Sequence, residues 1–296
     1  MLIYGSEASL SFLAESNDWF MDGTFSVAPP QFSQLYTAHG LRNGHHVIGC
    51  YGLLANKQGD TYIEFLQQVR QLTNDAQPTS IMVDFERACI NAITVVFPQA
   101  NVIGCLFHLC KSIYRHVQST GLQQQYLVDE VFRTNIRMIA AFAFVPLGDI
   151  ITAFEELSQH CEGNEDNILD YFEVNYIGEL RRGRRRNPLF AHTLLNINNR
   201  IENDLPRTNN ALEGWHRQFN TAFVAAHPTI WTFIAMLRND ASIQQIKAAQ
   251  YIAGGPPPKR RRVYETVNAR IRRLHADYAN RNTIDFLRGI SYNLSG

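Results

Sequence analysis

The residue best placed for chemistry is Asp84, which directly follows the apolar run Ile81-Met82-Val83. This run predicts a buried strand with Asp84 at its carboxyl end. A helix is expected over residues 86–97 and a second buried strand over residues 102–105. Such a unit joins parallel strands by a right-handed crossover, and open sheets of this kind hold their functional groups beyond the carboxyl ends of the strands. Asp84 is therefore a candidate site residue, with helix capping as the alternative role.

A second carboxylate, Asp22, lies in the first of three strands expected ahead of this unit. The strands cover residues 19–25, 32–39 and 46–54, and Asn43-Gly44 signals a turn between the last two. A helix over residues 61–72 then leads to the strand before Asp84. The order β-β-β-α-β-α-β predicts an α/β fold with a ribonuclease-H-like, mixed five-stranded sheet. In that arrangement the first and fourth strands are parallel neighbours, so Asp22 would face Asp84.

A third carboxylate, Glu213, belongs to a helix that is expected to begin after Thr208 or Asn209, either of which is a good N-cap. On one polar face of this helix lie Glu213, His216, Arg217 and Asn220, at i, i+3, i+4 and i+7. Trp215 belongs to the apolar stripe, where it either packs in the core or forms a platform for a base. The polar face is where a catalytic helix would need it.

The rest of the chain is expected to be helical, apart from a Gly/Pro-rich break. The expected division is a lead-in over 1–17, the first part of the core over 18–119, a helical insertion over 120–205, the second part of the core with the Glu213 helix over 206–250, a linker over 251–262 and a helical tail over 263–296.

Composition excludes several classes of protein. The chain has 296 residues and is 45% hydrophobic, which is enough for a packed core. Its longest apolar run, residues 138–147, is too short to cross a bilayer, and the amino terminus lacks the order of a signal peptide. Five cysteines without a CxxC pair argue against a disulfide framework and fit a reducing compartment. A globular protein with no membrane partner is expected.

The net charge of zero hides an asymmetry. Residues 1–180 hold 8 Lys and Arg against 20 Asp and Glu, a net charge of −12, and residues 181–296 hold 19 against 7, a net charge of +12. Two basic clusters dominate the second part: Arg181, Arg182, Arg184, Arg185 and Arg186, and then Lys259, Arg260, Arg261 and Arg262. A single cluster could be a solvated loop, but two together favour binding to nucleic acid.

Four motifs together carry a family resemblance. They are Asp22-Gly23-Thr24-Phe25, Asp84-Phe85-Glu86-Arg87-Ala88, Cys105-Leu106-Phe107-His108, and Arg207-Thr208-Asn209-Asn210 with Glu213-Gly214-Trp215-His216. In order and spacing they resemble the transposase domain of Mutator-like elements over about residues 22–237. The resemblance implies a ribonuclease-H-like core interrupted by a helical insertion. It also implies an Asp-Asp-Glu triad of Asp22, Asp84 and Glu213 that binds two divalent metal ions.

The implied chemistry is in-line cleavage of a phosphodiester with two Mg²⁺ or Mn²⁺ ions. Two such ions, about 3.5–4 Å apart, activate the attacking oxygen and neutralise the charge of the leaving oxygen. Magnesium prefers hard oxygen ligands, so three carboxylates and the scissile phosphate suffice. In this scheme Asp84 bridges both ions, and Asp22 and Glu213 each complete one site.

Several residues keep two interpretations. Glu86 is best explained as an acidic residue in the first turn of a helix, where the helix dipole favours it. Cys105 and His108 could bind zinc, but two ligands do not close a site, so a buried Cys and a hydrogen-bonded His behind the triad are preferred. His216 and Arg217 contact DNA phosphates or only solvent, and Arg207 is a further candidate for DNA binding. The run from Lys259 to Arg262 is either a nuclear-import signal or a basic loop that contacts DNA.

The resemblance predicts a cut-and-paste transposase core that cleaves DNA at element ends and joins the 3′-ends to a target. A domesticated nuclear derivative that binds DNA or protein without cutting is the alternative, and a structure-directed nuclease of the same fold is a third. Family members commonly carry a zinc-finger domain ahead of the Asp-Gly-Thr-Phe strand, whereas about twenty residues precede it here. A separate DNA-binding module is therefore an expected partner, and a homodimer is expected by analogy.

Overall fold

The computed structural model describes residues 1–161, 163–223, 226–259 and 262–294. The chain divides into two compact units. The first comprises residues 1–102 and 209–259, and the second comprises residues 103–208 and 260–296. Each unit is thus assembled from two separate stretches of the chain. The chain passes from one unit to the other between residues 102 and 103 and between residues 208 and 209. The domain boundaries expected at residues 119 and 205 remain predictions.

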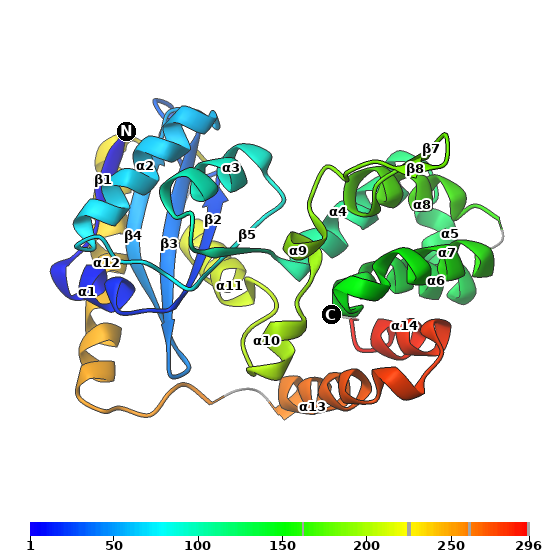
Figure 1. Cartoon of the computed structure of the whole chain (residues 1–296). Helices are drawn as coiled ribbons and strands as arrows, with labels where there is room; N and C mark the ends of the chain where they lie inside the picture. Colours follow the sequence, from blue (N-terminus) through cyan, green and yellow to red (C-terminus); the bar gives the residue numbers. More distant parts are fainter. Residues whose placement is uncertain (162, 224–225, 260–261, 295–296) are drawn as a thin grey trace. The chain divides into compact units, whose positions relative to one another are not determined.

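A six-stranded mixed sheet organises the first unit (Figure 1). Its spatial order is β1-β4-β3-β2-β5-β6. The strands are β1 (Leu2–Tyr4), β2 (Asp18–Thr24), β3 (Gln34–Arg42), β4 (His45–Leu54), β5 (Ser80–Val83) and β6 (Asn101–Gly104). Five of them were expected. The additional strand β1 pairs antiparallel with β4 at the edge of the sheet, and its three residues are too few to display a periodic pattern.

The pairing of β2 with β5 brings the two aspartates to the same end of the sheet. The strands are parallel, with Trp19 opposite Ile81 and Phe20 opposite Met82. Continuing this register by two residues places Asp22 alongside Asp84, which directly follows β5. Because side chains alternate along a strand, Asp22 belongs to the same face as Phe20, and Asp84 follows the end of the neighbouring strand. The expected parallel pairing of these strands is confirmed.

The hairpin of β3 and β4 confirms the expected turn. Asn43 and Gly44 have φ angles of 45° and 81°, the left-handed region that a tight two-residue turn between antiparallel strands requires. Asn and Gly are the residues that adopt this conformation at the lowest cost.

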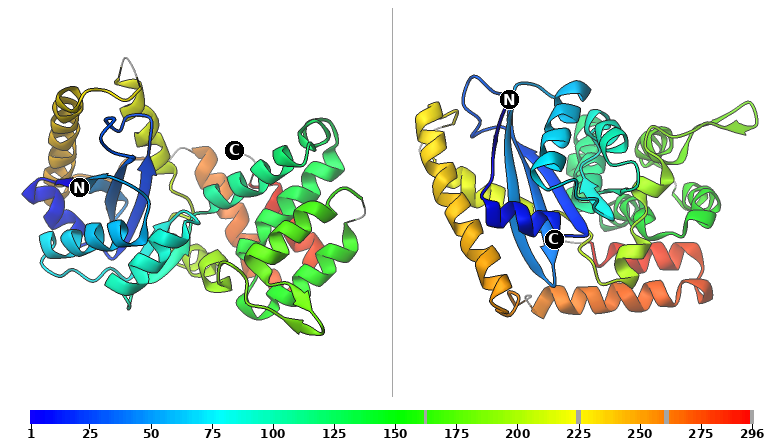
Figure 2. Two further views of the ribbon diagram at one scale, coloured as in Figure 1. Left: turned by 90° about the horizontal axis from the view of Figure 1, so that it is seen from above. Right: turned by 60° about the vertical axis from the view of Figure 1, so that its left-hand side comes forward.

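Helices cover both faces of this sheet (Figure 2). One face packs against α1 (Glu7–Ala14), α2 (Gly59–Leu72) and α3 (Arg87–Val96) around buried Trp19, Phe65 and Ile81. The other face packs against α11 (Asn210–Thr221) and α12 (Ile230–Ile252). Gly52 permits the close approach of α2, since a Cβ atom at this position would lie 2.5 Å from Phe65. The sheet therefore lies between two helical layers, and the Asp22 side chain belongs to the α11 layer.

The second unit is helical. Its α-helices are α4 (Leu106–Ser119), α5 (Gln123–Val128), α6 (Glu130–Ala140), α7 (Ile150–His160), α8 (Asp166–Phe172), α9 (His192–Leu195), α10 (Asn198–Glu202), α13 (Arg262–Ala276) and α14 (Thr283–Ser291). Helices α5 and α6 are separate, because Asp129 accepts hydrogen bonds from the backbone N–H groups of Val131 and Phe132 and so starts α6 as a new helix.

The end of the chain is part of the second unit's core. Helix α14 packs against α6 and α7, and its Phe286, Leu287 and Ile290 side chains are fully buried. Burial of three such side chains contributes several kcal/mol to folding. The tail is therefore a structural element of this unit. Across the described residues, no helix combines the length and the apolar character that crossing a bilayer demands.

Candidate active site

Asp22 lies near the carboxyl end of β2 and is 5% exposed. Its Oδ1 atom accepts a hydrogen bond of 2.8 Å from the backbone N–H of Gly23, which orients the carboxylate. A Cβ atom at position 23 would lie 2.6 Å from Oε1 of buried Gln34, so glycine suits this position. Asp22 thus presents a fixed carboxylate at the end of the sheet.

Glu213 reaches the same place from α11. A carboxylate oxygen of Glu213 lies within 4.8 Å of one of Asp22, although the two residues are far apart in sequence. His216, one turn later, is 6% exposed, and its Nδ1 atom lies 3.8 Å from Oδ2 of Asp22. Asn220, a further turn along, contacts the Thr24 hydroxyl at 3.3 Å. The polar face predicted for this helix therefore turns toward β2, while Arg217 is exposed to solvent.

Asp84, the remaining residue of the predicted triad, also lies in the first unit. It is partly buried in the turn between β5 and α3. The Cys89 thiol, in the first turn of α3, reports its surroundings: burial raises the pKa of this thiol, and the charges of Asp84, Glu86 and Asp22 raise it further. Asp84, Glu86 and Asp22 therefore lie within electrostatic reach of one buried sulfur atom. The triad assignment itself remains a prediction.

Trp215 anchors the Glu213 helix in the core. It is 9% exposed and stacks on Phe219 with ring centroids 4.9 Å apart. Its Nε1–H donates to Oδ1 of Asp240 on α12 at 3.0 Å, and the Tyr51 hydroxyl of β4 donates to the other oxygen of the same carboxylate. Buried Trp and Tyr side chains need such partners for their polar atoms. Of the two roles considered for Trp215, the structure has core packing.

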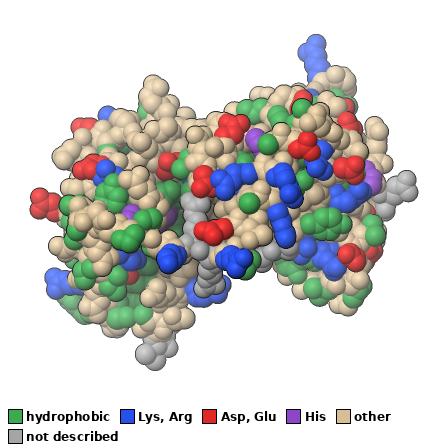
Figure 3. Space-filling model, turned by 90° about the horizontal axis from the view of Figure 1, so that it is seen from below, with side chains coloured by type: hydrophobic (Ala, Val, Ile, Leu, Met, Phe, Trp, Pro, Cys, Tyr) green, Lys and Arg blue, Asp and Glu red, His purple; other side chains and the backbone are tan. Residues whose placement is uncertain are grey.

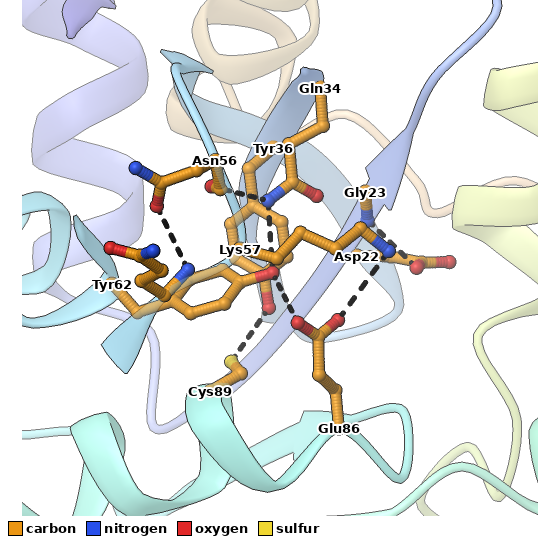
Figure 4. Close-up of polar contacts among 10 residues, drawn as sticks. Asp22, Gly23, Gln34, Tyr36, Asn56, Lys57, Tyr62, Glu86 and Cys89 are labelled. Atoms are coloured by element: carbon orange, nitrogen blue, oxygen red, sulfur yellow. Dashed lines mark hydrogen bonds and ion pairs between the residues drawn. The ribbon is translucent and has the colours of Figure 1, made fainter. Parts of the chain in front are cut away.

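Glu86 has tertiary contacts that the sequence did not predict. It occupies the N-cap position of α3, before the first turn, and its side chain makes no capping hydrogen bond. Instead, Oε1 accepts a hydrogen bond of 3.0 Å from the Tyr62 hydroxyl, and Oε2 lies 3.9 Å from Nζ of Lys57 (Figure 4). Burial and the charge of Asp84 raise the pKa of Glu86, against the opposing effects of Tyr62 and Lys57. Glu86 thus lies at the N-cap position instead of in the expected first turn and has tertiary partners, and the helix-dipole interpretation stays a prediction.

His39 and His46 form a histidine cluster next to Trp215, on the face of the sheet that packs against α11. Burial, with a contribution from Lys247, lowers the pKa of His46 to about 4. Burial also lowers the pKa of His39, and His46, His216 and Lys247 lower it further. The His39 ring lies 5.5 Å from that of His46 and 5.9 Å from that of Trp215. Both histidines are therefore neutral near pH 7.

We expect this cluster to make the first unit sensitive to acid. Unfolded His titrates near pH 6.5, so between pH 6.5 and about 4 the unfolded chain binds more protons than the folded one. Stability should therefore fall as the pH drops through this window, with His46 alone contributing up to about 3 kcal/mol. Urea unfolding at pH 7, 6, 5 and 4 measures the loss. The His46→Gln variant should show a shallower pH dependence, and an unchanged slope would contradict this origin.

Comparison with known proteins agrees with the family resemblance of the sequence motifs. Residues 19–112 match the family model of the MULE transposase domain. This part of the chain is a MULE transposase domain. A search of curated proteins found no match. The domain indicates a transposase-family function of the nuclease type, and hence DNA as a partner.

The matched segment of the MULE transposase domain contains two of the three predicted triad residues. Asp22 and Asp84 lie inside residues 19–112, and Glu213 lies outside them. Cys105 and His108 also fall inside. Cys105 is fully buried at the N-cap position of α4, and His108 is partly buried in the first turn of that helix, within the second unit.

The remaining motif residues lie at the start of the Glu213 helix. Asn209 is fully buried at the N-cap position of α11, and its carbonyl oxygen accepts a hydrogen bond of 2.9 Å from the Glu213 N–H. Asn210, the first helical residue, is exposed. Asn209 is thus at the expected N-cap position, and its contribution to α11 there is a backbone hydrogen bond without a side-chain cap.

Arg184, Arg185 and Arg186, which are predicted to bind DNA, lie in the second unit and differ in exposure. Arg184 and Arg186 are exposed on or beside the hairpin of β7 (Leu180–Arg181) and β8 (Arg184–Arg185). Arg185 instead pairs with Glu173 at 2.7 Å and Glu155 at 3.1 Å. Arg185 therefore holds the hairpin to its own unit.

Arg207 is also engaged within the second unit. Its guanidinium contacts Asn268 of α13 and lies over the Phe144 ring. Burial lowers the pKa of Arg207 to about 10, so the side chain remains charged at neutral pH. Its role in DNA binding stays a prediction.

Further basic residues lie on the surface near the end of the chain. Lys259 and Arg262 are exposed, whereas Arg260 and Arg261 lie outside the described residues. Exposed arginines of α13 are Arg262, Arg270, Arg272 and Arg273. Figure 3 shows Lys and Arg side chains spread over the face of the half that carries α13 and α14. The basic character of the second part of the chain is therefore displayed at the surface.

Proposed function

We propose that the chain is the catalytic core of a DDE-type transposase with a ribonuclease-H-like fold, which cleaves DNA and transfers its 3′-ends. The observation that carries the proposal is the approach of Asp22 and Glu213. Their carboxylate oxygens lie within 4.8 Å of one another beside the strand end that bears Asp84. Bringing like charges together is unfavourable unless a cation or a proton offsets the repulsion. A family match over the strands that carry both aspartates supports the same function.

The donor set fits magnesium or manganese. Both residues offer hard carboxylate oxygens, and the limit of 4.8 Å is close to the about 4 Å that separates oxygens on opposite sides of one Mg²⁺ ion. We propose that Asp22, Asp84 and Glu213 hold two such ions, with Asp84 shared between them. When bound, the ions would neutralise charge on the scissile phosphate and on the leaving oxygen and activate the attacking oxygen.

The chain's own residues contribute orientation. The Gly23 N–H fixes the Asp22 carboxylate, and the Trp215–Asp240 contact fixes α11 and with it Glu213. The position of His216 beside Asp22 suits a residue that steadies a ligand carboxylate. Preorganisation of this kind lowers the cost of assembling a charged site.

Metal dependence tests the proposal. We expect the purified protein to nick supercoiled plasmid in Mg²⁺ or Mn²⁺ and to lose this activity in EDTA. An Asp84→Asn protein purified in parallel reports contaminating nuclease. Equal nicking by both proteins, or nicking that persists in EDTA, would refute the assignment.

Nuclear localisation follows as a proposal from the same function. The basic run that includes exposed Lys259 and Arg262 has the composition of a nuclear-import signal. A fluorescent fusion of the full chain should accumulate in nuclei. The same fusion with Lys259 and its three following arginines replaced by Ala should spread through the cell, and unchanged nuclear accumulation would exclude this run as the signal.

A further inference from the structure

A lysine stands at the rim of the carboxylate site. Lys57 lies in the loop between β4 and α2, and its side chain is 45% exposed. Its Nζ atom lies 3.9 Å from the centroid of the Phe25 ring. The same atom lies 3.9 Å from Oε2 of Glu86 (Figure 4). Phe25 follows Asp22 by three residues, and Glu86 follows Asp84 by two. The ammonium group is therefore held by two residues that flank the predicted triad.

The loop that carries Lys57 is fixed by hydrogen bonds. The Ser33 hydroxyl donates to the Ala55 carbonyl at 2.6 Å. Oδ1 of Asn56 accepts from the Gln58 N–H at 2.9 Å and from the Thr61 hydroxyl at 2.7 Å. The backbone on both sides of Lys57 is thus held in place before any ligand arrives, which reduces the cost of binding.

Stability does not account for this arrangement. The ion pair between Lys57 and Glu86 is long and partly exposed, and pairs of this kind contribute about 0–1 kcal/mol. The Phe25 ring is itself 45% exposed, so the lysine covers one of its faces while the rest is open to solvent. An exposed cation beside an exposed aromatic ring is the combination that proteins use to bind a nucleic-acid strand.

We propose that Lys57, supported by Phe25, binds a backbone phosphate of the DNA. This phosphate lies a few nucleotides from the scissile phosphate. Phe25 and Glu86 lie three and two residues from a triad aspartate, so the backbone span and the side chains together place the ammonium on the order of 15 Å or less from the aspartates. At about 3.4 Å per nucleotide, this span covers up to roughly four nucleotides. Lys57 leaves Glu86 for the phosphate, and Glu86 keeps its hydrogen bond with Tyr62. The proposal rests on the proposed function and assigns a positioning residue to it.

Binding without metal provides a test that does not depend on activity. The probe is a fluorescein-labelled 30-base-pair duplex, titrated in EDTA at several NaCl concentrations and followed by anisotropy. We expect Lys57→Ala to weaken binding about tenfold. The slope of log K against log salt should fall by about 1, because one phosphate contact is lost. Lys57→Arg should retain most of the affinity and the original slope.

Two further variants separate the phosphate contact from a structural role. Glu86→Gln keeps an acceptor for Tyr62 but removes the competing charge, so it should bind the duplex more tightly than the wild-type protein. Lys247→Ala removes an exposed lysine of α12 that contacts Gln244, and it should bind like the wild type. A folded Lys57→Ala protein with unchanged affinity and slope would overturn the proposal, as would equal losses in Lys57→Ala and Lys247→Ala.

Failure of this proposal is distinguishable from failure of the proposed function. If the wild-type protein cleaves plasmid and Lys57→Ala binds the duplex normally, only the Lys57 contact is refuted. If Lys57→Ala shows the predicted loss of duplex affinity and the wild-type protein never cleaves in Mg²⁺ or Mn²⁺, the phosphate contact is supported and the catalytic function is refuted.

Discussion

Replacing Asp22 by Asn is expected to lower metal-dependent DNA cleavage by about 10³-fold or more. The substitution keeps the size of the side chain and an oxygen that can accept from the Gly23 N–H, but it removes the negative charge beside Glu213. Loss of a metal ligand forfeits several kcal/mol of transition-state stabilisation, and each 1.36 kcal/mol is a factor of about ten in rate. Initial rates of plasmid nicking in Mg²⁺ measure the effect, and circular dichroism verifies the fold.

Comparison with Glu213→Gln shows whether the two carboxylates act as a unit. If both hold the same catalytic assembly, each single variant should lose nearly all activity and the double variant should lose little more. Glu7→Gln, an exposed glutamate in the first turn of α1, is a matched control and should nick at the wild-type rate. Losses that multiply in the double variant would indicate independent roles, and full activity in either single variant would remove that residue from the site.

Replacing Trp215 by Ala is expected to destabilise the first unit by about 3–5 kcal/mol. The change removes a buried ring that packs on Phe219 and leaves Asp240 without its indole partner. For a unit of this size such a loss lowers the melting temperature by roughly 10 °C. Differential scanning calorimetry measures the shift.

Trp231→Ala is the matched control for this prediction. Trp231 begins the next helix, α12, and is 78% exposed, so its removal should change stability by no more than about 0.5 kcal/mol. Similar shifts for the two variants would contradict the assignment of Trp215 to the core. Because α11 carries Glu213, the Trp215 variant should also cleave DNA poorly at temperatures where it is still folded.

The central part of the sheet could be predicted from the sequence because its strands carry a strong local signal. Ile81, Met82 and Val83 are fully buried, as their apolar run indicates, and Asn43-Gly44 forms the expected turn. The parallel pairing of β2 with β5 followed from the order of elements alone. Strand β1 could not be predicted, because its pairing with β4 depends on long-range contacts and its three residues are too few to show a pattern.

The site was predictable only where the motif residues also obey a periodic pattern. Glu213 and His216 were found because helical spacing puts them on one face, which does turn toward Asp22. Lys57 gave no signal, because a single lysine in a loop is ordinary. The helix expected over residues 61–72 did not reveal the contact of the Tyr62 hydroxyl with Glu86, because this contact depends on tertiary packing. Contacts that join distant segments leave no trace in local spacing.

The discontinuous composition of both units has a consequence for synthesis on the ribosome. When residue 200 has been made, the first unit still lacks residues 209–259 and the second still lacks α13 and α14. Neither hydrophobic core can close at that moment, and the apolar surface of α6 that later receives Phe286 and Leu287 stays open. Nascent chains with such surfaces are prone to aggregate. This protein should therefore depend on chaperones until α13 and α14 emerge, and stop codons placed before them should yield insoluble products instead of smaller folded ones.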